Sequence, residues 1–125
     1  MATKPLIAVV DDDESIRETT KDLLDSAGFR AATFTSAEAL LKSNRLGSVS
    51  CLVSDMRMPG MSGLELHERL AASGTPIPTV LVTAYPEEPV RARALAAGVL
   101  CYLTKPFTAD ELLCCVNTGL RRGGP

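Results

Sequence analysis

Residues 6–13 read Leu-Ile-Ala-Val-Val-Asp-Asp-Asp, so an unbroken apolar run ends abruptly in three carboxylates. Short apolar runs without alternating polar residues are typical of strands that are covered on both faces of a parallel sheet. Similar runs lie at Cys51–Val53, Thr79–Val82 and Val99–Leu103, and we interpret Arg30–Phe34 as a further strand. The sequence therefore predicts five short strands.

The segments between these runs have the apolar spacing of amphipathic helices. Apolar residues share one helical face in three of the segments: Ile16, Leu23, Leu24 and Ala27; Val90, Ala94 and Ala97; and Leu112, Leu113, Val116 and Leu120. Because parallel strands need right-handed crossover helices, five βα units predict an open, doubly wound α/β sheet with helices on both faces. We expect residues 1–122 to form this single domain and residues 123–125 to be a tail or the start of a linker.

Capping residues predict where the helices begin and end. Asp13 is placed to cap the first helix and Gly28 to end it. Thr35 and Glu38 have the spacing of a capping box, which predicts that they cap the second helix. The third, fourth and fifth helices are expected to begin near Ser62, Pro86 and Thr108.

The composition narrows the classes of function. A net charge of -2, with Arg121-Arg122 as the only basic doublet, argues against nucleic-acid binding by this chain's own residues. No apolar run approaches the roughly 20 residues that span a bilayer, so we expect a cytoplasmic protein without membrane contact. The four cysteines lack metal-binding spacing and are expected to be reduced, and the sole histidine, His67, is expected to be solvated on the third helix.

Polar side chains follow four of the predicted strands, at the sheet edge where open α/β proteins bind ligands. They are Asp11 and Asp12 after the first strand, Asp55 after the third, Thr83 after the fourth and Lys105 after the fifth. Crowded carboxylates repel each other by about 4 kcal/mol per pair at 4 Å in an effective dielectric of 20. A cation would relieve this repulsion, and oxygen ligands without Cys or His suit Mg²⁺.

Asp55 leaves a buried strand and enters a turn rich in Pro and Gly. A carboxylate that attacks a phosphoryl group forms an acyl phosphate, whose extra charge must be met by a metal, a cation and a hydroxyl donor. Asp12, Lys105 and Thr83 supply these parts. We therefore hypothesise that Asp55 accepts a phosphoryl group.

Taken together, the chain resembles the receiver domain of bacterial two-component response regulators, especially FixJ-like regulators, from about Pro5 to Leu120. The matching segments are Val9-Val10-Asp11-Asp12-Asp13, Asp55-Met-Arg-Met-Pro-Gly-Met-Ser-Gly-Leu-Glu-Leu, Val82-Thr83-Ala84 and Tyr102-Leu-Thr-Lys105-Pro106-Phe107. Each segment is weak alone, but their order and spacing together are highly specific.

The resemblance implies a flavodoxin-like (βα)5 sheet with strand order 2-1-3-4-5. It also implies that Asp55 receives its phosphoryl group from a sensor histidine kinase or a phosphotransfer protein. Mg²⁺, for which Mn²⁺ can substitute, would be bound by Asp11, Asp12, Asp55 and the backbone carbonyl of Arg57. By the same resemblance, relatives commonly carry a separate DNA-binding domain after a linker, which points to transcriptional or relay signalling.

The resemblance further implies a switch around the phosphoryl group. Lys105 would pair with the phosphoryl oxygens, and the bond before Pro106 would be cis. Thr83 and Ala84 would approach the phosphoryl group while Tyr102 turns inward, which changes the output surface formed by the fourth helix, fifth strand and fifth helix. A phosphorylation-dependent homodimer would use that surface. From the residues alone, Tyr102 equally suits an ordinary strand aromatic with a solvated hydroxyl.

The alternative function is an aspartate-nucleophile phosphohydrolase, since such enzymes also place an aspartate at the end of a parallel strand. Those enzymes carry an Asp-x-Asp pattern in which the second aspartate protonates the leaving group. Here Arg57 occupies the position of the second aspartate. A flavin carrier of the same topology is disfavoured because the aspartates at 11–13 would repel an FMN phosphate. We therefore expect a phosphoacceptor signalling domain that is not an enzyme beyond its own phosphotransfer and dephosphorylation.

Overall fold

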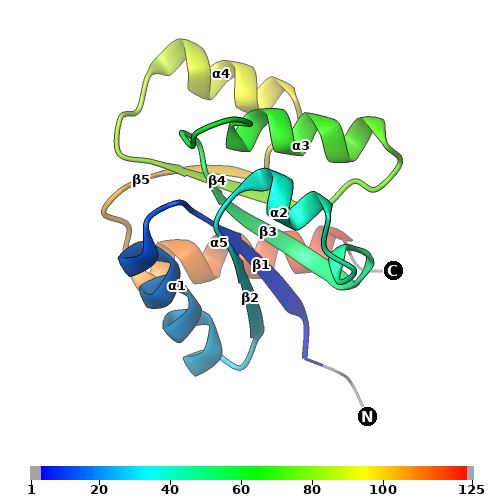
Figure 1. Cartoon of the computed structure of the whole chain (residues 1–125). Coiled ribbons are helices and arrows are strands. Elements are labelled where there is room, and N and C mark those ends of the chain that lie inside the picture. Colours follow the sequence, from blue (N-terminus) through cyan, green and yellow to red (C-terminus); the bar gives the residue numbers. More distant parts are fainter. Residues whose placement is uncertain (1–3, 124–125) are drawn as a thin grey trace.

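The computed structural model describes residues 4–123, which form one parallel sheet with the strand order β2-β1-β3-β4-β5 (Figure 1). The strands are β1 (Leu6–Val10), β2 (Arg30–Phe34), β3 (Val49–Asp55), β4 (Thr79–Thr83) and β5 (Cys101–Thr104). The helices are α1 (Glu14–Ser26), α2 (Ala37–Leu41), α3 (Gly63–Ala72), α4 (Glu88–Ala96) and α5 (Ala109–Gly123), with a short 3-10 turn η1 (Leu46–Ser48) before β3. The expected α/β class, flavodoxin-like strand order and position of the second strand are confirmed.

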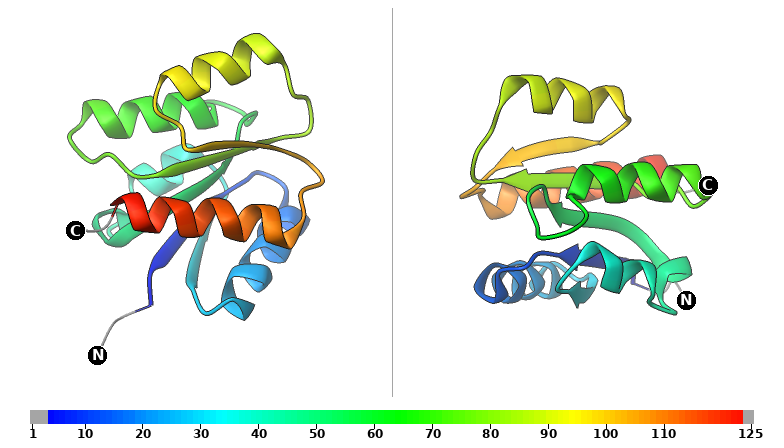
Figure 2. Two further views of the ribbon diagram at one scale, coloured as in Figure 1. Left: turned by 180° about the vertical axis from the view of Figure 1, so that it is seen from behind. Right: turned by 45° about the horizontal axis from the view of Figure 1, so that its top comes forward.

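Helices cover both faces of the sheet, as Figures 1 and 2 show. α1 and α5 lie on one face, where Leu24 and Leu112 pack against alternate residues of the central strands such as Val9 and Val53. α2, α3 and α4 lie on the other face, where Leu66 packs against the intervening residues. Because both faces are covered, β1 and β4 are buried along their whole length, which explains their unbroken apolar sequences.

The capping residues place most helix starts close to the predicted positions. The side chain of Asp13 accepts a hydrogen bond from Ile16 N, and Ser62 forms a full capping box with Glu65 at the start of α3. α4 begins at Glu88, two residues after the predicted Pro86. α5 begins directly after Thr108 and extends to Gly123, the first residue of the expected tail, while residues 124 and 125 lie outside the described part of the chain.

The predicted cap of α2 was wrong by one residue. Ser36, not Thr35, caps this helix, since its side chain accepts a hydrogen bond from Ala39 N at 3.1 Å. The carboxylate of Glu38 does not return to the helix start, because it accepts a hydrogen bond from the backbone of Met61 instead. Spacing alone could not distinguish two neighbouring hydroxyl residues, each of which is a suitable cap.

The predicted solvated position of His67 was also wrong. Only 8% of this residue is exposed, and both ring nitrogens have partners. Nδ1 lies 2.8 Å from Thr79 Oγ1, and Nε2 lies 3.0 Å from the backbone oxygen of Ala97 at the end of α4. The histidine is buried because α4 packs against this side of α3, a tertiary contact that the helical pattern of α3 does not reveal.

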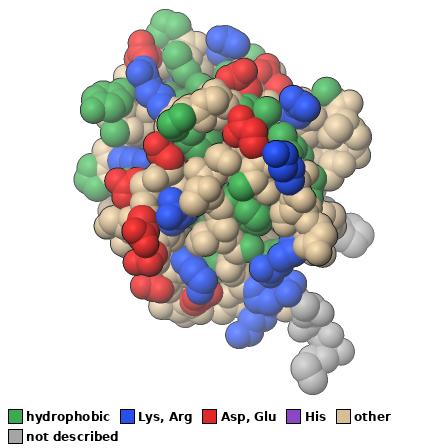
Figure 3. All heavy atoms as spheres, viewed as in Figure 1, with side chains coloured by type: hydrophobic (Ala, Val, Ile, Leu, Met, Phe, Trp, Pro, Cys, Tyr) green, Lys and Arg blue, Asp and Glu red, His purple; other side chains and the backbone are tan. Residues whose placement is uncertain are grey.

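The surface carries charges of both signs, and the thiols are free. Acidic and basic side chains are interspersed with apolar ones on the face seen in Figure 3. The four cysteines are free, and burial raises the pKa of the Cys51 and Cys115 thiols to about 12. Every helix within residues 4–123 is too short or too polar to cross a membrane.

Candidate functional site

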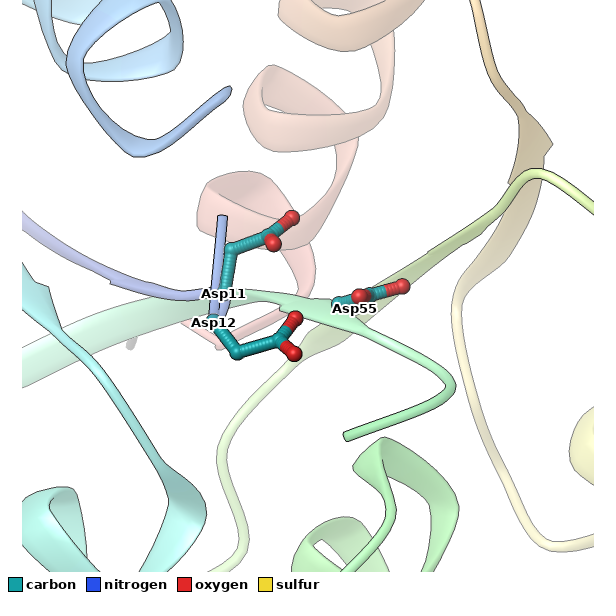
Figure 4. Close-up of side chains that lie close together, drawn as sticks. All are labelled: Asp11, Asp12 and Asp55. Atoms are coloured by element: carbon teal, nitrogen blue, oxygen red, sulfur yellow. The ribbon is translucent and has the colours of Figure 1, made fainter. Parts of the chain in front are cut away.

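Three carboxylates meet at the carboxyl edge of the sheet. Val10 pairs with Ser54 in the β1–β3 ladder, so the next residue of each strand, Asp11 and Asp55, comes to the same edge. Together with Asp12 they offer carboxylate oxygens that lie within 4.8 Å of one another (Figure 4). Asp11 and Asp55 are only 2% and 7% exposed, whereas Asp12 faces solvent. This cluster of Asp11, Asp12 and Asp55, the acidic edge, is therefore a concentration of negative charge that is open to solvent at Asp12.

Lys105 brings one positive charge to this cluster. Its Nζ lies 3.1 Å from Asp11 Oδ2 and 3.4 Å from Asp55 Oδ1. The lysine is held at the end of β5 by a hydrogen bond from its backbone N–H to the Thr83 carbonyl, and the bond to Pro106 is cis. One ammonium group cannot balance three carboxylates, so the site keeps a net negative charge that suits a divalent cation.

The pKa of Asp55 is also consistent with a site that has too little positive charge. Burial raises the pKa of this carboxyl above its ordinary value, and the nearby charge of Asp11 raises it further. Lys105 and a hydrogen bond from the Arg57 backbone partly offset these effects. The charged form of Asp55 thus lacks full compensation from the protein itself, and an added cation would favour it.

The carboxylate oxygens of Asp11 already have partners within the protein, whereas the carboxylate of Asp12 is exposed. Asp11 Oδ1 accepts a hydrogen bond from Asp13 N at 2.9 Å, and its Oδ2 faces Lys105. The Asp11 backbone carbonyl accepts a further bond from Arg17 at 2.8 Å. Within residues 4–123, the Asp12 carboxylate has no hydrogen-bond partner, which leaves it open to a metal ion.

The other predicted site residues lie on the neighbouring strands. Thr83 ends β4 and is buried, with its Oγ1 accepting a hydrogen bond from Tyr85 N at 3.1 Å. Ala84 follows and is exposed. Tyr102 is half-buried and lines a separate cavity of about 320 Å³ beside Arg57 and Tyr85. The structure thus brings Lys105 into contact with the acidic residues, whereas Tyr102 lies at a separate cavity.

Residues 7–117 match the family model of the response regulator receiver domain. This chain belongs to that family. It is the receiver domain of a two-component response regulator, and it has the strand order that the family resemblance implied.

Known proteins similar to this receiver domain include longer regulators. The transcriptional regulatory protein FixJ of Bradyrhizobium diazoefficiens is 38% identical over 125 residues, which cover 100% of this chain and 61% of FixJ. The response regulator protein TmoT of Ectopseudomonas mendocina is 36% identical over 116 residues, or 93% of this chain and 53% of TmoT. The receiver domain therefore spans about half to three fifths of the length of these relatives.

Solved structures show the same fold. The response regulator StyR superposes with a TM-score of 0.88 at 46% identity, covering 97% of the receiver domain and 61% of that chain. The structure named FixJ-N superposes with a TM-score of 0.85 at 30% identity, covering 96% of both chains.

The Arg57 side chain makes two contacts that the sequence did not predict. Its side chain forms an exposed ion pair with Glu87, just before α4, and lies 5.6 Å from the centre of the Tyr85 ring. The residue therefore links the loop after Asp55 to the start of α4. The ion pair with Glu87 was not predicted, because a side-chain partner 30 residues away leaves no local signal in the sequence.

Gly63 lets the start of α3 pack directly against the backbone of Asp55. A Cβ atom at this first residue of α3 would lie 2.4 Å from the Asp55 carbonyl oxygen and 2.8 Å from Leu81 Cδ2. The α3 backbone consequently approaches β3 more closely than any side chain would permit. This close approach also lets Gly63 N donate a hydrogen bond to the Met56 carbonyl at 3.1 Å.

Proposed function

We propose that this receiver domain accepts a phosphoryl group on Asp55 in a reaction that depends on Mg²⁺. The donor is the phosphohistidine of a sensor histidine kinase or a phosphotransfer protein, as expected for the family. The observation that supports this most is the cluster of three carboxylates within 4.8 Å of one another, with the Lys105 ammonium against two of them.

The residues of the acidic edge fit a hard divalent cation. Asp12 would bind it directly, Asp11 largely through water because its oxygens are engaged, and Asp55 and the Arg57 carbonyl would complete the protein ligands. Mn²⁺ suits the same oxygen ligands. When bound, the ion supplies positive charge that offsets the charge on the phosphoryl oxygens.

The protein groups divide the remaining work of the transfer. A carboxylate oxygen of Asp55 forms the new O–P bond while the N–P bond of the phosphohistidine breaks, and the leaving imidazole keeps the electron pair of that bond. Lys105 exchanges its contact with Asp55 for one with a phosphoryl oxygen. The Thr83 hydroxyl and the Ala84 backbone N–H lie at the end of the next strand, where they can donate hydrogen bonds to the other oxygens.

The test is to incubate the protein with acetyl phosphate, with and without Mg²⁺, and to follow its intact mass. We expect a single phosphoryl adduct that requires Mg²⁺ and that Asp55→Asn lacks, because the amide is not a nucleophile. The FixJ receiver domain, labelled in parallel, controls for the activity of the reagent. An unmodified wild type under conditions that label this control would exclude Asp55 as the acceptor.

An apolar groove beside the acidic edge supports a protein as the phosphoryl donor. The groove encloses about 500 Å³ and is lined by Ser15, Ile16, Thr19, Thr20, Leu23, Ala84, Lys105, Pro106 and Phe107. Lys105 belongs both to this groove and to the site, so a partner helix seated against α1 would hold its phosphohistidine next to Asp55.

A large side chain in the groove should slow phosphoryl transfer from a protein donor without changing transfer from acetyl phosphate. We expect Thr19→Arg to slow transfer from a phosphorylated histidine phosphotransfer protein by about tenfold, equivalent to about 1.4 kcal/mol of lost binding. Labelling by acetyl phosphate should stay unchanged, since Thr19 is exposed and lies outside the acidic edge. Ala72→Arg, at the exposed end of α3, is the matched control. Equal transfer rates for the two variants, measured by radiolabel transfer, would count against the groove as the docking site.

The proposed output is a change in the surface formed by α4, β5 and α5. Thr83 moves toward the phosphoryl group and Tyr102 turns into the cavity beside Arg57, which alters this surface and lets two phosphorylated copies associate through it. In this proposal the domain is a signalling phosphoacceptor and not a turnover enzyme. Any nucleic-acid binding comes from a separate domain, as in a transcriptional regulator.

A further inference from the structure

The loop that follows Asp55 carries a proposed metal ligand, the carbonyl of Arg57, so its conformation matters to the site. Its first residue is held by β4, because Met56 N donates a hydrogen bond to the Val82 carbonyl at 2.8 Å. Its last residue is held by the capping box of Ser62 at the start of α3. Between these two points, residues 57–61 must be fixed by other contacts.

Glu38 of α2 provides such a contact. Its Oε2 accepts a hydrogen bond from Met61 N at 3.2 Å, although the two residues are 23 positions apart in the sequence. The same oxygen would lie 2.8 Å from a Cβ atom on Gly60, whose φ of +82° already favours glycine. The carboxylate thus lies directly against the loop backbone, and two neighbouring residues of the loop are shaped around it.

Glu38 lies half-buried in the first turn of α2, and its carboxylate faces the loop backbone. On the opposite side of the loop, the Arg57 side chain pairs with Glu87, but both partners of that pair are more than half exposed. An exposed pair of this kind adds little rigidity, whereas Glu38 is half-buried. The side chains of Met58 and Met61 also pack against the core, and Glu38 adds a polar contact to the loop backbone.

We propose that Glu38 is a positioning residue for phosphoryl transfer, which holds residues 57–61 so that the Arg57 carbonyl faces the metal beside Asp55. This inference rests on the proposed function. Glu38 acts through the loop backbone and touches neither metal nor phosphoryl group. Its role resembles that of the outer groups which orient metal ligands in other proteins.

The experiment compares Glu38→Ala, Glu38→Gln and the control Glu68→Ala, which removes an exposed acid from α3. Hydrogen exchange of the Met61 amide is measured by NMR without metal, and the dissociation constant of Mg²⁺ is measured from the amide resonances of residues 57–61. Acetyl phosphate labelling is then followed at a range of Mg²⁺ concentrations.

We expect Glu38→Ala to lose protection of the Met61 amide and to weaken Mg²⁺ binding by about tenfold. Labelling should need correspondingly more Mg²⁺ but reach the wild-type rate at saturation. Glu38→Gln keeps an acceptor oxygen and should restore Mg²⁺ affinity, as Glu68→Ala should retain it. Equal Mg²⁺ affinity in wild type and Glu38→Ala would overturn the role of Glu38. A wild type that binds Mg²⁺ but takes no phosphoryl group would instead overturn the proposed function.

Discussion

Replacing Gly63 with alanine is expected to destabilise the receiver domain by about 3 kcal/mol, at the upper end for overpacking, and to lower its melting temperature by about 10 °C. The added methyl group would lie 2.4 Å from the Asp55 carbonyl oxygen and 3.0 Å from Ser54 Oγ. These atoms cannot yield easily, because Ser54 and Asp55 belong to a central strand that is hydrogen-bonded on both sides. Relief of the clash would displace α3 or the acceptor itself.

Urea unfolding measures this effect, and Gly47→Ala supplies the matched control. Gly47 lies in the 3-10 turn before β3, and a Cβ atom there would have no neighbour within 4 Å. We expect this control to change the free energy of unfolding by no more than about 0.5 kcal/mol. Similar unfolding midpoints for the two variants would mean that there is room for a methyl group between α3 and β3 at Gly63.

Replacing Asp55 with asparagine is expected to stabilise the metal-free protein at neutral pH by on the order of 1 kcal/mol, because burial and the charge of Asp11 together disfavour the Asp55 carboxylate by more than Lys105 and the Arg57 backbone offset. The pKa of Asp55 is raised in the folded state, so the folded protein holds this proton more tightly than the unfolded chain. The contribution of Asp55 to wild-type stability should therefore fall as pH rises from the unfolded pKa of about 3.9 through the higher folded value.

The difference in the free energy of unfolding between wild type and Asp55→Asn should therefore be largest above the folded pKa of Asp55. It should vanish below the unfolded pKa. Chemical unfolding in the absence of metal, at pH 7 and at pH 3.5, measures it. Mg²⁺ should raise the melting temperature of wild type and have a much smaller effect on the variant. A variant less stable than wild type at pH 7 would show that the Lys105 pair outweighs burial and Asp11.

The sequence was informative wherever a local pattern and the sheet topology act together. Buried parallel strands require unbroken apolar runs, so the first and fourth strands could be located to within about one residue. The ends of parallel strands share one edge, so residues as distant as Asp11 and Lys105 could be predicted to meet, and they lie 3.1 Å apart. The expectation that Asp12 rather than Asp11 binds the metal directly came from the family resemblance and stays a prediction.

Contacts between helices and loops were not predictable in this way. His67 contacts the end of α4, Glu38 contacts the loop after Asp55, and Arg57 contacts the segment before α4. Each of these contacts joins residues at least 23 positions apart and depends on how two elements pack, which no local periodicity encodes. The choice of Ser36 over Thr35 as a cap depends on the same packing, since it fixes where the chain turns from β2 into α2.

The burial of His67 has a consequence for the mechanics of α4. Ala94 is the only residue of that helix, among those described, that is fully buried, and no side chain caps its first turn. Its far end is secured by the imidazole, which satisfies the Ala97 carbonyl and is itself bonded to Thr79 in the sheet. We therefore expect α4 to resist local unfolding mainly at its end near Ala97, and its first turn to open at a lower free-energy cost.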